Sequence, residues 1–212
     1  MYYNLKKILN ENCQYNLIIG VPRIGKTYTI LKYGLEKYIK GGEQMAYIRR
    51  TSKEIQGSLL FAVLAHRGEI EKMTNGEYNA VYYYSSRWYL CRIIDGERIK
   101  TDEKPFCFGF SIASVDYATI EYFPNISTIC FDEFLTNKYL PNEFNRFMHL
   151  IYNISQNRDN VKIFMLANPV DCFSPYFSKM GITNIKNMNQ GDIALSTYGK
   201  SQLKIAVEIC ER

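Results

Sequence analysis

The chain has 212 residues, of which 47% are hydrophobic and 22% charged, the usage of an ordinary globular protein. This length excludes a peptide hormone or a disulfide-rich miniprotein, and the composition excludes a mainly disordered or fibrous chain. With 26 Lys and Arg against 21 Asp and Glu, the net charge of +5 permits a polyanionic partner without requiring one.

The cysteines and histidines do not form a pattern typical of a zinc site. None of the six cysteines stands in Cys-x-x-Cys spacing, and neither His66 nor His149 lies near one of them. The N-terminus resembles no signal peptide, and no apolar run reaches the ~18 residues of a membrane span. We therefore expect a soluble protein from a reducing, intracellular compartment.

The first part of the chain predicts alternating helices and strands. A short helix around residues 5–9 precedes an apolar strand at 15–19, and helical periodicity then runs from residue 28 to residue 41. A second strand at 45–48 follows, and residues 52–73 predict one helix. The apolar side of that helix comprises Leu59, Leu60, Val63 and Leu64.

Residues 80–113 interrupt this alternation and predict a β-rich insertion. Apolar segments at 82–84, 88–94 and 106–112 predict strands, and Asp95-Gly96 is a hairpin turn signal.

Alternation returns in the second half of the chain. A strand at 126–131, a helix over about 141–156 and a strand at 161–167 follow one another, whereas the weak alternation of the tail predicts no element. The whole pattern predicts one α/β domain over residues 1–212, with a mostly parallel central sheet covered by helices on both faces.

The segment Gly20-x-x-x-x-Gly25-Lys26-Thr27 matches a phosphate-binding loop and lies between a predicted strand and a predicted helix. Glycines let backbone amides surround a phosphate, and the helix N-terminus adds positive potential. Lys26 would reach the β- and γ-phosphates of ATP, and Thr27 would hold Mg²⁺. A chance turn before a helix is the alternative. The expected nucleotide contacts are Gly20, Val21, Pro22, Arg23, Ile24, Gly25, Lys26, Thr27 and Tyr28.

Two carboxylates follow the apolar strand at 126–131, at the end of the strand where ligands of open α/β sheets bind. Asp132 would bind Mg²⁺. Glu133, directed to the other side of the strand end, would polarise a water for attack on the γ-phosphate, which predicts hydrolysis rather than nucleotide storage. An exposed acidic turn after a core strand is the alternative.

Two polar residues flank the strand at 161–167. Asn168 would lie beside the nucleotide and sense the γ-phosphate if this strand neighbours the first one, or else it opens a loop before a proline. Arg158, in the preceding turn, would be an arginine finger supplied to a neighbouring subunit, a role worth about 10³ to 10⁵ in rate. A solvated arginine in a polar turn is the alternative.

Candidate nucleic-acid contacts follow the second strand. Arg49, Arg50 and Lys53 would contact DNA phosphates, flank the adenine or simply be exposed. Arg23 would touch a phosphate or pair with an acid such as Glu133. The tyrosines at 82–84 have two interpretations, base stacking and a packed strand, of which the packed strand is the more common.

These motifs occur in a specific order along the chain. They are Gly20 to Thr27, Glu43-Gln44-x-x-Tyr47-x-Arg49-Arg50, Asn125-x-Ser127-Thr128-Ile129-x-Phe131-Asp132-Glu133-Phe134, Pro141-Asn142-Glu143, Asn157-Arg158 and Pro175-Tyr176-Phe177. Together, over about residues 5–177, they resemble the genome-packaging ATPases of small phi-29-like podophages.

The resemblance implies a P-loop ATPase of the ASCE type that uses ATP and Mg²⁺ to drive double-stranded DNA into an empty prohead. It implies a homo-oligomeric ring, usually a pentamer, at the portal vertex in the host cell cytoplasm, with the portal and a packaging RNA as further partners and no membrane. The family's C-terminal nuclease-like domain would be absent from this chain.

The resemblance also implies residue roles. Lys26 and Thr27 would be the Walker A pair, and Asp132 and Glu133 the Walker B pair. Asn168 would stand at the coupling motif, Arg158 in the turn of the trans-acting arginine, and Lys53 one position from the DNA-gripping lysine.

Two other classes of function stay open. A small-molecule or nucleoside kinase also has a phosphate loop, but it needs an acceptor pocket and a lid of arginines. A nucleotide-gated assembly module would bind ATP with little turnover, and the presence of Glu133 next to Asp132 argues against it.

Overall fold

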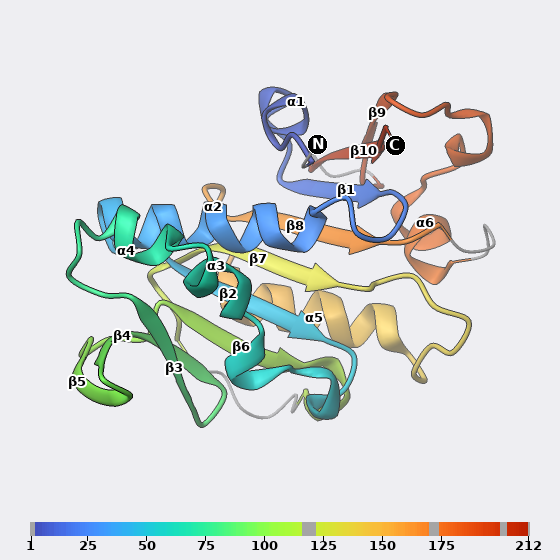
Figure 1. The fold of residues 1–212 in the computed structure, drawn as a ribbon. Coiled ribbons are helices and arrows are strands. Elements are labelled where there is room, and N and C mark those ends of the chain that lie inside the picture. Colours follow the sequence, from blue (N-terminus) through green and yellow to red (C-terminus); the bar gives the residue numbers. More distant parts are fainter. Residues whose placement is uncertain (1–2, 116–121, 170–173, 200–202, 212) are drawn as a thin grey trace.

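The computed structural model describes residues 3–115, 122–169, 174–199 and 203–211. Ten strands form one mixed sheet in the order β3-β4-β6-β2-β7-β8-β1-β10-β9, and β5 pairs with β4 (Figure 1). The strands are β1 (Tyr15–Ile19), β2 (Gln44–Arg49), β3 (Ala80–Tyr84), β4 (Arg87–Ile94), β5 (Glu97–Thr101), β6 (Cys107–Ser111), β7 (Ile126–Asp132), β8 (Lys162–Ala167), β9 (Ile193–Thr197) and β10 (Lys204–Ile209).

The centre of the sheet is parallel, as predicted. Strands β6, β2, β7, β8, β1 and β10 pair in parallel, whereas β9 and the β3–β5 strands attach in antiparallel fashion at the two ends. The carboxyl ends of the central strands therefore meet along one edge of the sheet.

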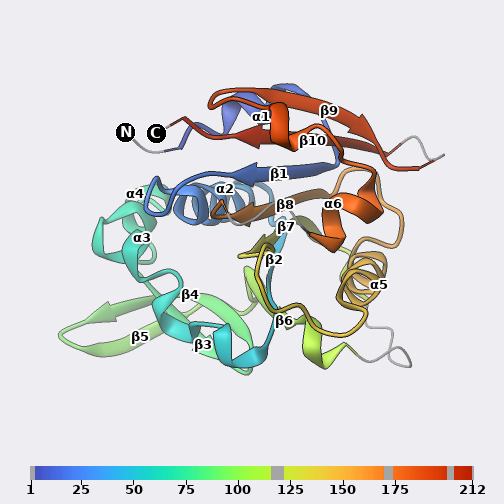
Figure 2. The same cartoon turned by 90° about the vertical axis from the view of Figure 1, so that its right-hand side faces the viewer.

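Helices cover both faces of the sheet (Figure 2). Those on one face are α1 (Lys6–Asn10), α2 (Lys26–Gly41), α3 (Ala62–His66) and α4 (Glu69–Met73), and those on the other are α5 (Glu143–Ser155) and α6 (Pro175–Met180). Within the described ranges, no helix is long and apolar enough to cross a membrane.

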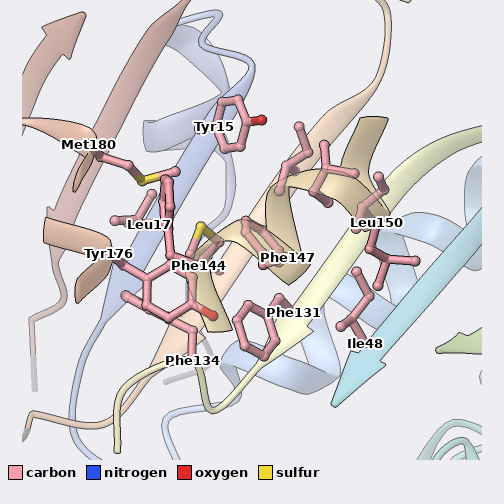
Figure 3. Packing of buried hydrophobic residues seen from close by; sticks show 14 of the residues in the cluster. Tyr15, Leu17, Ile48, Phe131, Phe134, Phe144, Phe147, Leu150, Tyr176 and Met180 are labelled. Carbon is pink, nitrogen blue, oxygen red and sulfur yellow. The ribbon is translucent and has the colours of Figure 1, made fainter. Parts of the chain in front are cut away.

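An aromatic cluster fixes the carboxyl end of β7 against α5 and α6 (Figure 3). The Phe131 ring lies 5.1 Å from Phe147 and 5.8 Å from Tyr176, and Phe134 lies 5.6 Å from Tyr176, between ring centroids. These side chains are fully buried, so they hold the two acidic residues that lie between Phe131 and Phe134 in a defined position.

The β-rich character of residues 80–113 is confirmed, and the region forms part of the central sheet. Its last strand, β6, pairs in parallel with β2, while β3, β4 and β5 form an antiparallel extension that we call the arm (residues 80–101). The predicted turn joins β4 to β5, with positive φ angles at Asp95 and Gly96.

The single helix predicted over residues 52–73 is wrong. The segment forms two 3₁₀ turns, at Ser52–Glu54 and Gly57–Leu59, followed by the short helices α3 and α4. Gly57 and Gly68 adopt φ angles of +53° and +65°, which interrupt helical geometry. Leu60 and Leu64 are buried, but Leu59 is 69% exposed and Val63 51% exposed, so the predicted apolar side is only half formed.

The tail contains elements that the sequence did not predict. Strand β10 pairs in parallel with β1, and β9 then forms the end of the sheet. The β10 residues Ile205, Ala206 and Val207 are buried, but Lys204 and Glu208 flank this run and shorten its apolar signal.

Candidate active site

The phosphate-binding loop lies at the carboxyl edge of the parallel strands, between β1 and α2, with the ends of β7 and β8 beside it (Figure 1). Gly25 precedes α2 with a φ angle of +88°, which favours glycine. Gly20 has no room for a side chain, because an added Cβ would lie 2.6 Å from the Cβ of Cys210. Glycine is therefore required at both positions of the motif, at Gly25 by the backbone conformation and at Gly20 by the lack of space.

Lys26 is anchored within its own loop. Its Nζ donates hydrogen bonds to the carbonyls of Gly20 at 2.6 Å and Val21 at 2.9 Å, and to Oδ1 of Asn168 at 3.2 Å. Burial lowers the pKa of the Lys26 ammonium. A phosphate oxygen would replace one or more of these acceptors. The sequence placed Asn168 beside the loop only if its strand neighbours the first strand. Strand β8 does pair with β1, so Asn168 lies beside the loop.

Thr27 and Asp132 lie in direct contact. The Thr27 hydroxyl donates to Oδ2 of Asp132 at 3.0 Å, and the Tyr47 hydroxyl approaches the same oxygen at 3.2 Å. Burial raises the pKa of the Asp132 carboxyl, and the nearby Arg49 guanidinium opposes that rise. A hydroxyl and a carboxylate placed together are oxygen ligands of the kind Mg²⁺ prefers, so this pair fits the ion.

Glu133 has different surroundings from Asp132. Its side chain is 58% exposed, and its Oε2 pairs with Nη2 of Arg49 at 2.7 Å. Its backbone has a φ angle of +58°, uncommon for a residue other than glycine, which turns the chain sharply after β7. Glu133 therefore lies at the mouth of the site while Asp132 lies inside it.

These side chains line one cleft of about 300 Å³. Its lining residues are Pro22, Arg23, Gly25, Lys26, Thr27, Tyr28, Asp132, Glu133, Ala167 and Asn168. Among the expected nucleotide contacts, Gly20, Val21 and Ile24 are not in this lining. Arg23 is exposed and has a φ angle of +68°.

Arg49 and Arg50, which were expected to contact DNA, are instead buried, since both side chains are only 9% exposed. Arg49 pairs with Glu133 and lies 3.9 Å from Asp132. Arg50 forms a two-point ion pair with Glu143, at 2.8 and 3.0 Å, and donates to the backbone carbonyls of Glu133 and Phe134. Both arginines therefore hold the segment that carries Glu133. Lys53 is exposed in the first 3₁₀ turn.

Arg158 is bound to its own chain. Its guanidinium donates to the carbonyls of Ile154 and Ser155 at the end of α5, and to those of Phe123 and Pro124 before β7, at 2.7–3.0 Å. A contact with a neighbouring subunit would break these bonds. Within the single chain, Arg158 therefore links the end of α5 to the segment before β7 at the amino edge of the sheet, and its contact with a neighbouring subunit stays a prediction.

The network around Arg50 was missed by the sequence analysis. Glu143, 2% exposed, accepts hydrogen bonds from Arg50, from the Tyr176 hydroxyl at 2.9 Å and from the Leu140 amide at 2.7 Å. Glu143 and Tyr176 both lie in motifs that carry the family resemblance, Pro141-Asn142-Glu143 and Pro175-Tyr176-Phe177. Their place in these motifs was the only sign in the sequence that they matter. Their partners are distant in sequence, so no local pattern identified the network.

Comparison with known proteins identifies relatives over most of the chain. Residues 1–197 match the family model of the podovirus DNA encapsidation protein (Gp16). The DNA packaging proteins of Bacillus phages PZA and phi29 are each 30% identical over 181 residues, which cover 84% of this chain and 49% of the relative. The chain thus spans about half the length of these relatives.

Solved structures share the fold. The N-terminal domain of the DNA packaging ATPase from bacteriophage phi29 has a TM-score of 0.69 and 26% identity, covering 99% of this chain and 96% of that domain. The large terminase ATPase domain of Thermus phage P74-26 has a TM-score of 0.58 at 13% identity, covering 99% of this chain and 80% of that one. The fold is therefore that of phage packaging ATPase domains, with the α/β architecture of P-loop NTPases.

Proposed function

Because this chain belongs to the podovirus DNA encapsidation protein family, we propose that it is an ATPase motor domain that moves double-stranded viral DNA into a preformed capsid. The observation that carries the proposal is the convergence of Lys26, Thr27, Asp132 and Glu133 on one cleft. This is the set of groups that phosphoryl transfer to water requires.

Phosphate binding is the first task of the cleft. The amides of the loop and the N-terminus of α2 face the position where the β-phosphate binds. Lys26 exchanges its contacts with Gly20, Val21 and Asn168 for phosphate oxygens. The Asn168 side chain then lies beside the γ-phosphate and changes its hydrogen bonds when the γ-phosphate leaves.

Thr27 and Asp132 would hold Mg²⁺, and the ion would supply positive charge that offsets the negative charge of the phosphates. The Tyr47 hydroxyl keeps the Asp132 carboxylate oriented toward Thr27.

Glu133 acts on the attacking water as a general base. It accepts a proton as the water oxygen bonds to the γ-phosphorus, the bond to ADP breaks and inorganic phosphate leaves. To do so, its carboxylate must release the ion pair with Arg49, which now occupies Oε2. The backbone of Glu133 stays fixed meanwhile by the bond from Arg50 to its carbonyl.

The wider assembly is proposed from the family and its relatives. A structure of the bacteriophage phi29 motor is described as a viral genome packaging motor assembly, and we assign this chain to a homo-oligomeric ring, with five subunits, at the portal vertex of the prohead in the host cytoplasm. The portal and a packaging RNA complete the partners. Lys53, exposed after β2, is the proposed DNA phosphate contact.

The test is ATP hydrolysis by the chain with and without linear double-stranded DNA, at low and high salt. In the wild type, we expect DNA to stimulate ATP hydrolysis, and this stimulation to weaken at high salt because salt screens the phosphate contacts. In Lys53→Ala the stimulation should be smaller, because one phosphate contact is removed. Lys72→Ala, which removes an exposed lysine on α4, is the matched control. Hydrolysis without any response to DNA would contradict the translocation proposal and leave the ATPase proposal standing.

A further inference from the structure

The arm presents one sheet face that differs in chemistry from the other. Directly paired residues of antiparallel strands point to the same face, and the pairs are Tyr82 with Tyr89, Tyr84 with Arg87 and Arg98 with Ile93. Tyr82, Tyr84, Tyr89 and Arg87 thus share one side, which we call the tyrosine face. Arg98 belongs to it as well, because its guanidinium lies against the Tyr82 ring beyond a register shift in the β4–β5 pairing.

The opposite side of the arm is used for packing. Tyr83 lies 4.9 Å from the fully buried Trp88, between ring centroids, and Trp88 donates a hydrogen bond to the carbonyl of Gly57. The sequence left two interpretations of the tyrosines at 82–84, a packed strand and base stacking, and each fits alternate residues of the run. Tyr83 belongs to a packed strand, whereas Tyr84, on the tyrosine face, is 64% exposed.

The rings of the tyrosine face have the geometry of a stacking platform. Tyr82 and Tyr84 are parallel within 5°, and their centroids are 6.4 Å apart. This separation is the ordinary spacing of residues i and i+2 on one face of a strand, and the two parallel rings present their faces to a flat group in the same orientation. Tyr89 extends the surface, with its centroid 6.3 Å from that of Tyr82.

The charge on this face has one sign. The Arg98 guanidinium lies 3.6 Å from the centroid of the Tyr82 ring, and Arg87 lies at the end of the face, over Phe108. Glu97 is opposite Ile94 and points to the other side. Cations beside aromatic rings favour binding of a nucleic acid, which has both phosphates and flat bases, over binding of an acidic peptide.

We propose that the tyrosine face binds single-stranded nucleic acid, with unpaired bases stacked on Tyr82 and Tyr84 and phosphates held by Arg87 and Arg98. Stacking tolerates any base, so the site selects strandedness rather than sequence. In a duplex the bases are paired and stacked on one another, so they cannot stack on Tyr82 and Tyr84. The site is separate from the ATP cleft and does not depend on the proposed ATPase activity.

The test is fluorescence anisotropy of the full chain with oligothymidylate and oligouridylate of about twelve residues and with a duplex of equal length. We expect the single strands to bind at least tenfold more tightly than the duplex at low salt in a Lys53→Ala background, which removes the proposed duplex contact. Tyr82→Ala and Tyr84→Ala should each weaken this binding by roughly tenfold, while Tyr82→Phe and Tyr84→Phe retain it because the ring is kept. Tyr152→Ala, at an exposed tyrosine of α5, is the control.

Three results would overturn the proposal. The first is a duplex affinity that falls as much as the single-strand affinity in Tyr82→Ala and Tyr84→Ala, and the second is unchanged single-strand binding in both variants. The third is that these variants lose self-association in sedimentation while they bind single strands as the wild type does. The last would make the face an interface between copies of this chain. If an alanine variant fails to fold, crosslinking of a 5-iodouracil oligonucleotide to the wild type decides, since the crosslink must fall within residues 82–89.

Discussion

The carboxyl edge of the central sheet and the arm place charged side chains in opposite surroundings. At the edge, Arg49 and Arg50 are buried and bonded to carboxylates and carbonyls of their own chain. On the arm, Arg87 and Arg98 are exposed and lie over aromatic rings. A buried charge must have internal partners, whereas an exposed one is available to an external ligand. Charge near a binding site is thus no evidence of ligand contact until burial is known.

The largest effect should come from separating Arg50 from Glu143. Removing one partner leaves the other as an uncompensated buried charge, so Glu143→Ala should lower the free energy of unfolding by about 3–5 kcal/mol. Urea unfolding measures it, with Glu97→Ala on the exposed β5 as the control. A loss below ~1 kcal/mol would mean that the pair is no more than a surface ion pair.

Arg158→Ala should cost about 1–3 kcal/mol of stability, because two carbonyls at the end of α5 and two before β7 lose a charged donor. ATP turnover per folded molecule should stay near that of the wild type. A fall in turnover by about 10³ with unchanged stability would instead support an arginine finger.

Much of the edge could be predicted from sequence, because its signals are local. The loop at 20–27, strand β7 and the acidic pair after it follow one another within short windows, and the structure brings them together as expected. The partners of Arg49, Arg50 and Arg158 could not be predicted, since they lie 34 to 93 residues away or are backbone carbonyls. Strand β10 was missed because its stability comes from pairing with β1.

The smallest effect concerns Glu208, a carboxyl of β10 that is 4% exposed and bonded to the Tyr3 hydroxyl. Burial raises its pKa. A raised carboxyl pKa means that the folded state binds the proton more tightly than the unfolded state, so this group destabilises the fold as pH rises above the ordinary glutamate value. Glu208→Gln should therefore unfold at a higher temperature than the wild type at pH 7, and this gain should vanish near pH 4.

The control for that comparison is Glu211→Gln, an exposed carboxyl paired with Lys7. It should show little difference from the wild type at either pH. A Glu208→Gln chain that is less stable than the wild type at pH 7 would show that the ionised carboxylate contributes favourably there.

We propose above that the cleft between β1, β7 and β8 hydrolyses ATP, with Glu133 acting on water rather than holding the nucleotide. Parallel measurement of ATP affinity and of single-turnover hydrolysis in Glu133→Gln tests it most directly. We expect an ATP affinity within a few-fold of the wild type and a hydrolysis rate reduced by about 10²- to 10⁴-fold. Hydrolysis at the wild-type rate in that variant would contradict it.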